Sequence, residues 1–92
     1  EGVVVVIVTV DHEDGSIVNG PEVITKGWVY APEAENLLDE ARTAVADSVL
    51  AALGRGDKDI ESLQRVVRKT AGKFVSDRTK RRPMIVPVVM SI

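Results

Sequence analysis

Cysteine is absent from the 92-residue chain, and histidine occurs only once. Without cysteine the chain has no disulfide framework and no thiolate metal site, which fits a reducing compartment. The single histidine, His12, stands in the acidic segment 11–15. Catalytic triads and zinc sites need a histidine that converges with several partners, and the sequence supplies none. We therefore expect no catalytic residue, no metal ligand and no cofactor in this chain.

Aromatic residues and long apolar runs are also scarce. The chain has three aromatic side chains, and no apolar run reaches the roughly 18 residues that span a membrane. A composition of 45% hydrophobic and 28% charged residues is typical of a globular protein. We predict one domain over residues 1–92, with no membrane partner. Because Glu1 leads directly into an apolar segment without an initiator methionine, we interpret the chain as part of a longer protein.

The net charge of −2 hides a strong asymmetry between the two parts of the chain. Residues 1–54 carry two basic and ten acidic side chains, a balance of −8, whereas residues 55–92 carry ten basic and four acidic ones, a balance of +6. A positive face of this kind can attract an anionic partner, although a dipolar, solvated surface explains the same pattern.

Two segments, 3–10 and 84–92, are rich in β-branched residues and predict strands. Each is apolar on both alternating faces, so each needs cover on both sides. Residues 17–26 form the expected return strand of a hairpin, because the Asp-Gly pair at 14–15 is a turn signal. The Asn-Gly-Pro sequence at 19–21 is expected to break or bulge that strand.

The spacing predicts a first helix that starts near Pro32 and stops at Gly54. Its outer face is acidic, and Leu50 is an apolar exception on that face. The inner, core-facing residues are expected to be Ala34, Leu37, Leu38, Ala41, Val45, Ser48, Val49 and Ala52.

A second helix is expected after an N-cap at Asp57 or Asp59, and it should fray through residues 76–78 before Pro83. Its outer face is basic. Its apolar stripe is expected to be Ile60, Leu63, Val67, Ala71 and Phe74, with Val66 and Val75 at the flanks.

The element order is therefore β-β-α-α-β, and the fold class is α+β. We predict a two-layer domain in which a three-stranded mixed sheet of order 2-1-3 carries both helices on one face. The helical hairpin returns the chain so that the last strand runs parallel to the first. Pro87 lacks an N–H group and favours an edge position for the last strand.

A sheet face that the helices leave bare would be available to a partner. The candidate interface residues come from the two strands that are apolar on both faces and from the apolar residue on the acidic face of the first helix. They are Val4, Val6, Val8, Leu50, Val86 and Val88.

Basic residues of the second half offer an alternative role, in RNA binding. The basic cluster at residues 80–82 extends the basic helix face. Lys26 is close in sequence to two aromatic residues, Trp28 and Tyr30, whose rings could stack on bases. Core-capping aromatics and a solvated basic surface explain the same residues. The candidate RNA-binding residues are Lys26, Trp28, Lys69, Lys73, Lys80, Arg81 and Arg82.

The segment 54–57, Gly-Arg-Gly-Asp, joins the two helices where the RNA-binding loop lies in KH domains. Its glycine spacing differs from the G-x-x-G of those domains. A helix stop followed by a helix cap explains the segment fully.

Two segments resemble one known family. Residues 20–30, GPEVITKGWVY, are similar to the motif G-P-[DE]-[IV]-[IV]-[ST]-[RK]-G-[FW]-[VI]-Y in the C-terminal domain of bacterial ribonuclease J. Residues 80–90, KRRPMIVPVVM, resemble the K-R-[RK]-P-M-I-[LIV]-P-[VI]-[VI]-[ML] ending of the same family. Because they flank a helix pair of the expected length, the resemblance covers nearly the whole chain.

The resemblance implies three strands facing two helices, and a longer parent enzyme with metallo-β-lactamase and β-CASP domains. That parent is a zinc-dependent ribonuclease, with exonucleolytic 5′-to-3′ and endonucleolytic activity, in cytoplasmic mRNA decay and rRNA maturation. Its metal-binding H-x-H-x-D-H motif is missing from this sequence, so no catalytic or metal-binding residue can be assigned here. The implied role is that of an accessory C-terminal domain that supports dimerisation and full activity. The implied partners are the catalytic region of the parent chain and a second copy.

Overall fold

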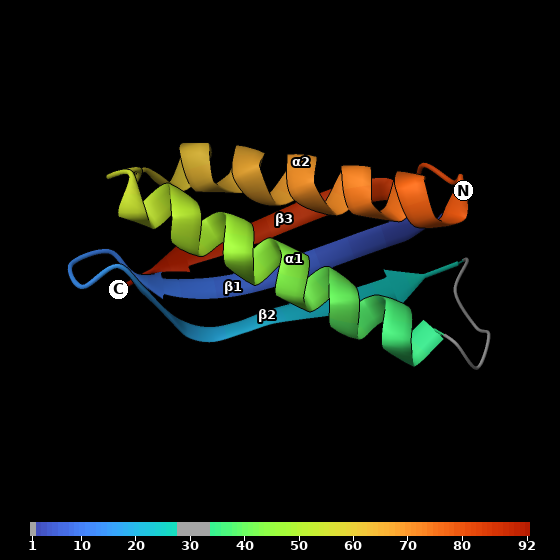
Figure 1. Ribbon diagram of the computed structural model, residues 1–92, viewed down its shortest axis with the longest axis horizontal. Coiled ribbons are helices and arrows are strands. Elements are labelled where there is room, and N and C mark those ends of the chain that lie inside the picture. The colour runs from blue at the N-terminus through green and yellow to red at the C-terminus, as the bar shows by residue number, and fades with distance from the viewer. Residues whose placement is uncertain (1, 28–33) are drawn as a thin grey trace.

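The computed structural model describes residues 2–27 and 34–92. The element order is β1 (Val3–Asp11), β2 (Ser16–Lys26), α1 (Ala34–Gly54), α2 (Ile60–Thr79) and β3 (Met84–Ser91) (Figure 1). This order confirms the predicted β-β-α-α-β arrangement.

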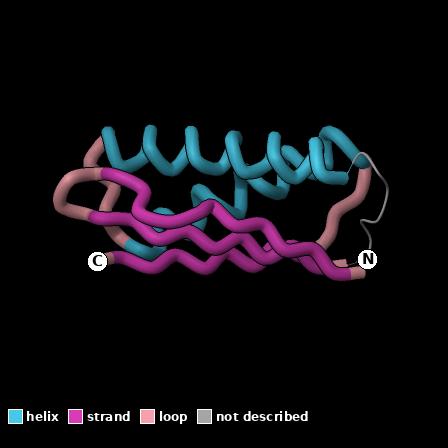
Figure 2. Tube along the Cα trace, turned by 90° about the horizontal axis from the view of Figure 1, so that it is seen from below, coloured by secondary structure: helices cyan, strands magenta, loops and turns pink. Residues whose placement is uncertain are grey.

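The three strands form one mixed sheet with β1 in the centre. The strand order is β2-β1-β3, with β1 antiparallel to β2 and parallel to β3. Figure 2 shows both helices in one layer and the sheet in the other. Among the described elements none covers the second face of the sheet, which confirms the predicted two-layer architecture.

Alternate residues of β1 have different surroundings. The side chains at 4, 6, 8 and 10 are at most 1% exposed, whereas those at 3, 5, 7 and 9 are only half-buried. The buried set packs beneath the helices, against residues such as Val45, Val49, Leu63 and Val67. Burial of this continuous valine row is a main source of the fold's stability.

The hairpin between β1 and β2 contains the predicted irregularity. The pairing register shifts between Ile7 and Thr9, opposite the segment that contains Gly20 and Pro21. Gly20 has a φ of +85°, and a Cβ atom there would lie 2.6 Å from the carbonyl oxygen of Ile7. Glycine is needed because the backbone is left-handed and packed against its neighbour.

Helix α1 buries part of the set that its periodicity predicts, namely Ala41, Val45, Val49 and Ala52. The predicted residues Leu37, Leu38 and Ser48 are only half-buried. Helix α2 differs from the prediction at both ends of its stripe. Ile60 is 39% exposed, and Val75 is buried where Phe74 was expected. The reason is that Ile60 is the first helical residue, while Phe74 is half-buried and lines a shallow hollow together with residues of α1.

The C-terminal end of α2 also corrects the sequence prediction. The helix does not fray at residues 76–78 but continues to Thr79. Lys80 then takes a left-handed conformation, with a φ of 61°, and its N–H donates to the Ser76 carbonyl. This cap satisfies a terminal carbonyl of the helix. At the start of α2 the N-cap is Asp59, which accepts a hydrogen bond from the Ser62 N–H.

Candidate interaction surfaces

The most prominent candidate site is the face of the sheet opposite the helices. We call it the open face. Residues that pair across neighbouring strands project to the same face of the sheet, so the pairing register shows which residues form the open face. Its residues are Val3, Val5, Ile7 and Thr9 of β1, Glu22, Ile24 and Lys26 of β2, and Met84, Val86, Val88 and Met90 of β3.

The open face is largely apolar and accessible in the isolated chain. Met84 is 64% exposed, Ile24 47% and Met90 46%. The β-branched residues of β1 and β3 between them are half-buried. A contiguous exposed apolar patch rimmed by polar residues is characteristic of an interaction surface.

The structure places the predicted interface residues on different sides of the sheet. Val86 and Val88 lie on the open face, but Val4, Val6 and Val8 are essentially fully buried beneath the helices. Because every residue from Val3 to Val8 is apolar, the sequence pattern did not show which alternate set faces the helices. The accessible apolar residues of β1 are Val3, Val5 and Ile7.

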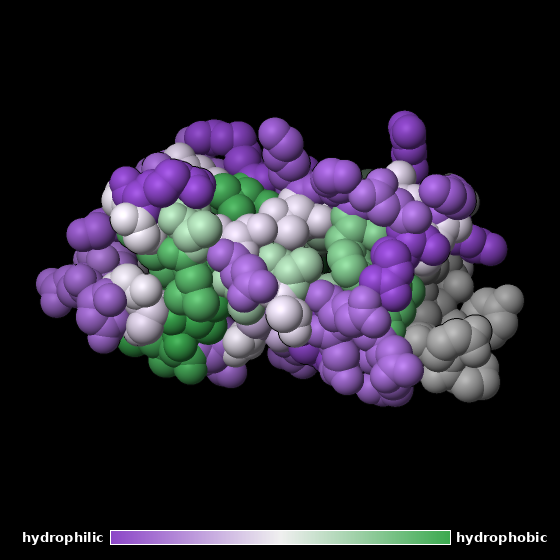
Figure 3. Space-filling view, in the orientation of Figure 1, coloured by the Kyte–Doolittle hydropathy of each residue, from purple (hydrophilic) through white to green (hydrophobic). Residues whose placement is uncertain are grey.

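Leu50, the remaining predicted interface residue, is 44% exposed on the outer surface of α1. It therefore lies in the helix layer and not on the open face. Figure 3 views this helix side, where hydrophilic side chains cover much of the surface and apolar atoms gather in smaller patches.

A second candidate site is a shallow groove between α2 and β3, which we call the basic groove. Three cations line it, Arg65, Arg68 and Lys69. Its apolar floor is made by Gly72, Pro83 and Ile85. The predicted basic residue Lys69 lies here. The sequence did not show the groove, because its two walls are separated by the turn that follows α2.

The other predicted RNA-binding residues within the described ranges do not line the basic groove. Lys73 is paired with Asp77, at 2.8 Å between Nζ and Oδ2, and this hydrogen bond raises the pKa of Lys73. Lys80 forms the helix cap, and the Arg81 N–H donates to Thr79 Oγ1 at 3.1 Å. The side chain of Lys73 is thus paired within α2 itself, whereas the Lys80 contact is made by its backbone N–H.

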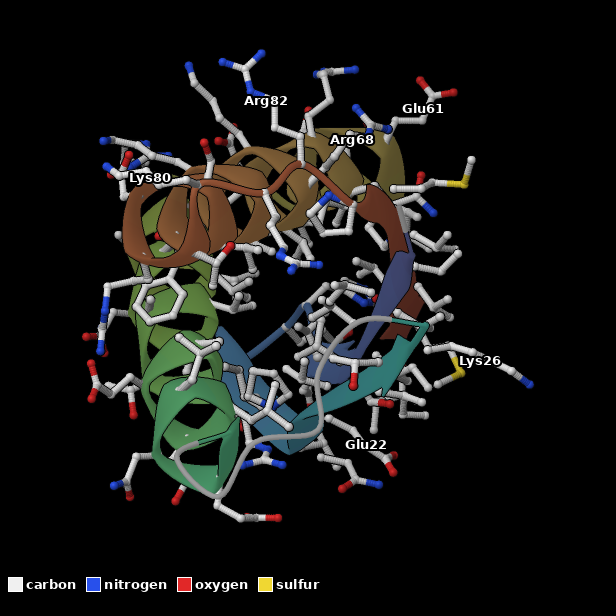
Figure 4. All side chains as sticks on the ribbon, turned by 90° about the vertical axis from the view of Figure 1, so that its right-hand side faces the viewer. Glu22, Lys26, Glu61, Arg68, Lys80 and Arg82 are labelled. Carbon is white, nitrogen blue, oxygen red and sulfur yellow. The ribbon has the colours of Figure 1, made fainter. Side chains whose placement is uncertain are left out.

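Lys26 and Arg82 point to different sides of the molecule. Figure 4 shows Lys26 extending away from the sheet on the side opposite the helices, while Lys80 and Arg82 extend from the α2 side. Lys26 therefore lies on a different side of the molecule from the basic cluster at residues 80–82. Trp28, the remaining candidate, lies outside the described residues.

The two helices are tied together at one end by Arg78. Its guanidinium donates to the carboxylate of Glu40 on α1 and lies 5.1 Å from the centre of the Phe74 ring. The Arg78 hydrogen bond, and then its charge, lowers the pKa of Glu40 below its ordinary value of 4.5. This contact joins the acidic helix to the basic one.

The acidic turn after β1 is organised by its own hydrogen bonds. The Asp11 carboxylate accepts the backbone N–H groups of Glu13 and Asp14, at 2.9 and 3.3 Å. The His12 ring lies 3.1 Å from Ser91 Oγ. Within residues 2–27 and 34–92, no group of three or more histidine or carboxylate side chains is placed to hold a metal ion.

The turn between the helices forms a helix stop. The N–H groups of Gly56 and Asp57 donate to the carbonyls of Leu53 and Ala52, each at 3.0 Å.

In the described part of the chain, neither helix has the length and apolarity needed to cross a membrane.

These features define a small α+β domain of two layers, with one apolar sheet face left open. The sequence profile of the Ribonuclease J C-terminal domain matches residues 1–92, the whole chain. The chain belongs to this family, as its two motifs indicated.

Individual relatives agree with the family match. The chain is 34% identical over 92 residues to Ribonuclease J2 of Bacillus subtilis (strain 168). It is 38% identical over 94 residues to Ribonuclease J 2 of Staphylococcus saprophyticus, and 36% identical over 92 residues to that of Staphylococcus aureus (strain NCTC 8325). Each alignment covers all of this chain but only 16–17% of the relative, so the chain spans about one sixth of these proteins.

Proposed function

We propose that this chain is the accessory C-terminal domain of a ribonuclease J, and that it supports the enzyme by joining two copies through the open face. The observation that carries this proposal is the exposed apolar surface formed by residues such as Ile24, Met84 and Met90. Burying such a surface against another protein removes apolar area from water and is favourable.

The proposed parent enzyme is a zinc-dependent exo- and endoribonuclease of cytoplasmic mRNA decay and rRNA maturation. The family match and the names of the relatives support a ribonuclease J as the parent. The described residues offer no fitting set of zinc ligands. In this proposal the catalytic site lies in the parent's catalytic region, and this domain contributes association.

Two matched substitutions test the proposal. Ile24 and Leu50 are nearly equally exposed, at 47% and 44%, but only Ile24 lies on the open face. Ile24→Lys places a charge in the proposed contact, so we expect the chain to become monomeric by light scattering. Leu50→Lys adds the same charge on α1 and should leave the mass unchanged. Dissociation by Leu50→Lys alone would place the contact on the helices and contradict the proposal.

A second candidate function is binding of the RNA backbone, which the basic groove specifically favours. Arg65, Arg68 and Lys69 bring three positive charges to one hollow beside β3. Phosphate contacts of this type release counterions, so affinity falls steeply with salt.

A pair of double variants tests this candidate with equal loss of charge. Arg68→Ala with Lys69→Ala removes groove cations, whereas Arg55→Ala with Lys58→Ala removes two exposed cations near the turn between the helices. Using single-stranded RNA, we expect only the first pair to reduce the slope of log affinity against log salt, by about 1.4 for two phosphate contacts. Equal slopes in both double variants would rule out a role for the groove.

A further inference from the structure

The open face has an internal order that the cross-strand register makes explicit. Val5 of β1 pairs with Ile24 of β2 on one side and Val86 of β3 on the other, which gives an apolar middle row. The row before it consists of Lys26, Val3 and Met84. The row after it consists of Glu22, Ile7 and Val88.

The two outer rows are related by charge. Each has one ionisable residue, at the same position on the edge strand β2, and the two residues have opposite signs. Lys26 and Glu22 are both exposed. Within the described ranges neither has an ion-pair partner, since the ion pairs there involve other residues.

A two-fold axis along the middle row converts one outer row into the other. If a second copy packs its open face on the first about this axis, β2 lies over β2 of the partner in the opposite direction. Lys26 then lies over Glu22 of the second copy, and Glu22 over Lys26 of the second copy. Val3 correspondingly lies over Ile7, and Met84 over Val88.

We propose that the partner of the open face is a second copy of this chain, packed about this two-fold axis with two reciprocal Lys26–Glu22 ion pairs. This inference rests on the proposed self-association and adds its symmetry, register and charge contacts. Stacked sheets lie about 10 Å apart, a gap that the long Lys26 and Glu22 side chains span at the rim. The contact uses the same patch on both copies, so the assembly closes at two.

Charge complementarity selects a second copy over another occupant. An apolar surface of any protein could cover the middle row, but the reciprocal placement of one cation and one anion about that row is a property of self-pairing. Figure 4 shows Glu22 and Lys26 along the sheet side of the molecule, away from the cations at the outer side of α2.

The test exchanges these two charges in the 92-residue chain at low ionic strength. Glu22→Lys places two lysines against each other at both contacts of the dimer, and Lys26→Glu places two glutamates there. Each single variant should dissociate about tenfold or more readily than the unmodified chain, because like charges oppose one another. The double variant Glu22→Lys with Lys26→Glu should regain the affinity of the unmodified chain.

Mixing the two single variants gives the sharpest result. One chain then has two acidic and the other two basic residues at these positions, so both contacts are complementary only in the mixed dimer. We expect native mass spectrometry to show mixed dimers in clear excess over either self-dimer. The controls Asp47→Lys and Lys58→Glu make the same changes of charge away from the open face, and they should leave the dimer unchanged. Circular dichroism establishes that each variant is folded.

Three outcomes separate the inference from the proposed function. A stable dimer that neither charge reversal weakens overturns the register and leaves self-association intact. A dimer weakened by each reversal, with no excess of mixed dimers and no recovery in the double variant, also overturns the reciprocal pairing. If the unmodified chain stays monomeric and the mixture of the two single variants forms no mixed dimer, both the inference and the proposed self-association are overturned.

Discussion

At the scale of single residues, glycine conformation decides whether β2 can pair with β1 through its irregular segment. Gly15 and Gly20 both have positive φ values, of +71° and +85°. A Cβ atom at Gly15 would meet nothing within 4 Å, whereas one at Gly20 would approach the Ile7 carbonyl oxygen and the Glu22 nitrogen at 2.6 and 3.0 Å. The two positions therefore differ in crowding and share the same backbone requirement.

We expect Gly20→Ala to destabilise the fold more than Gly15→Ala. The left-handed conformation costs about 1–2 kcal/mol at either position, and the contact with Ile7 raises the loss at Gly20 to about 2–4 kcal/mol. Urea denaturation at equal protein concentration measures the difference, because association would otherwise shift the midpoint. Equal losses would show that the bulge relaxes to accept a methyl group.

The contact between Glu40 and Arg78 predicts a pH dependence. Since Arg78 lowers the pKa of Glu40, the contact stabilises the folded chain above the ordinary pKa of 4.5. This contribution is lost as the pH falls through the lowered pKa of the folded state. Thermal unfolding of Glu40→Gln should therefore change less between neutral and acidic pH than that of the unmodified chain. Asp47→Asn, also on the outer face of α1, is the control, and an equal response in both variants would contradict this role.

At the scale of elements, the apolar stripe of α2 was predictable from its spacing, but its ends were not. Spacing identified Leu63, Val67 and Ala71, which are all buried. It also included Ile60 and placed fraying at residues 76–78. The helix instead runs through these residues, supported by the Lys73–Asp77 pair and by the ion pair of Arg78 with Glu40 of α1. Such contacts with side chains and another helix override local sequence signals.

A comparison of two truncations tests the observed boundary of this stripe. Leu63 is completely buried, so Leu63→Ala should cost about 2–5 kcal/mol through lost burial and a cavity. Ile60 is 39% exposed, and Ile60→Ala should cost less than about 1 kcal/mol. Chemical denaturation measures both changes. A similar cost at both positions would mean that Ile60 belongs to the core after all.

At the scale of the whole molecule, the sequence was sufficient for the architecture and insufficient for the surfaces. Element order, sheet order and strand direction followed from segment types and from the helical hairpin. The sequence did not show which side of β1 faces the helices. Valine occurs in both alternating sets of this strand, so the hydrophobic pattern does not distinguish the buried set from the exposed one. The basic groove also required the fold, since it joins side chains of α2 to Pro83 and Ile85.

The division of charge in the sequence also becomes spatial in the fold. The acidic part of the chain supplies α1, and the basic part supplies α2 and the groove beside it. The open face lies on the other side of the sheet and carries few charges, among them Glu22 and Lys26. Self-association through the open face would leave the basic groove of each copy accessible, so the two proposed roles are compatible.

The most direct test of the central claim is the mass of the unmodified 92-residue chain by sedimentation equilibrium over a wide range of concentrations. The chain has a mass of 9.9 kDa. We predict a reversible rise from this mass to twice its value, with no larger species, because a two-fold contact closes at two copies. A mass that stays at that of one chain up to the highest concentration would contradict self-association through the open face.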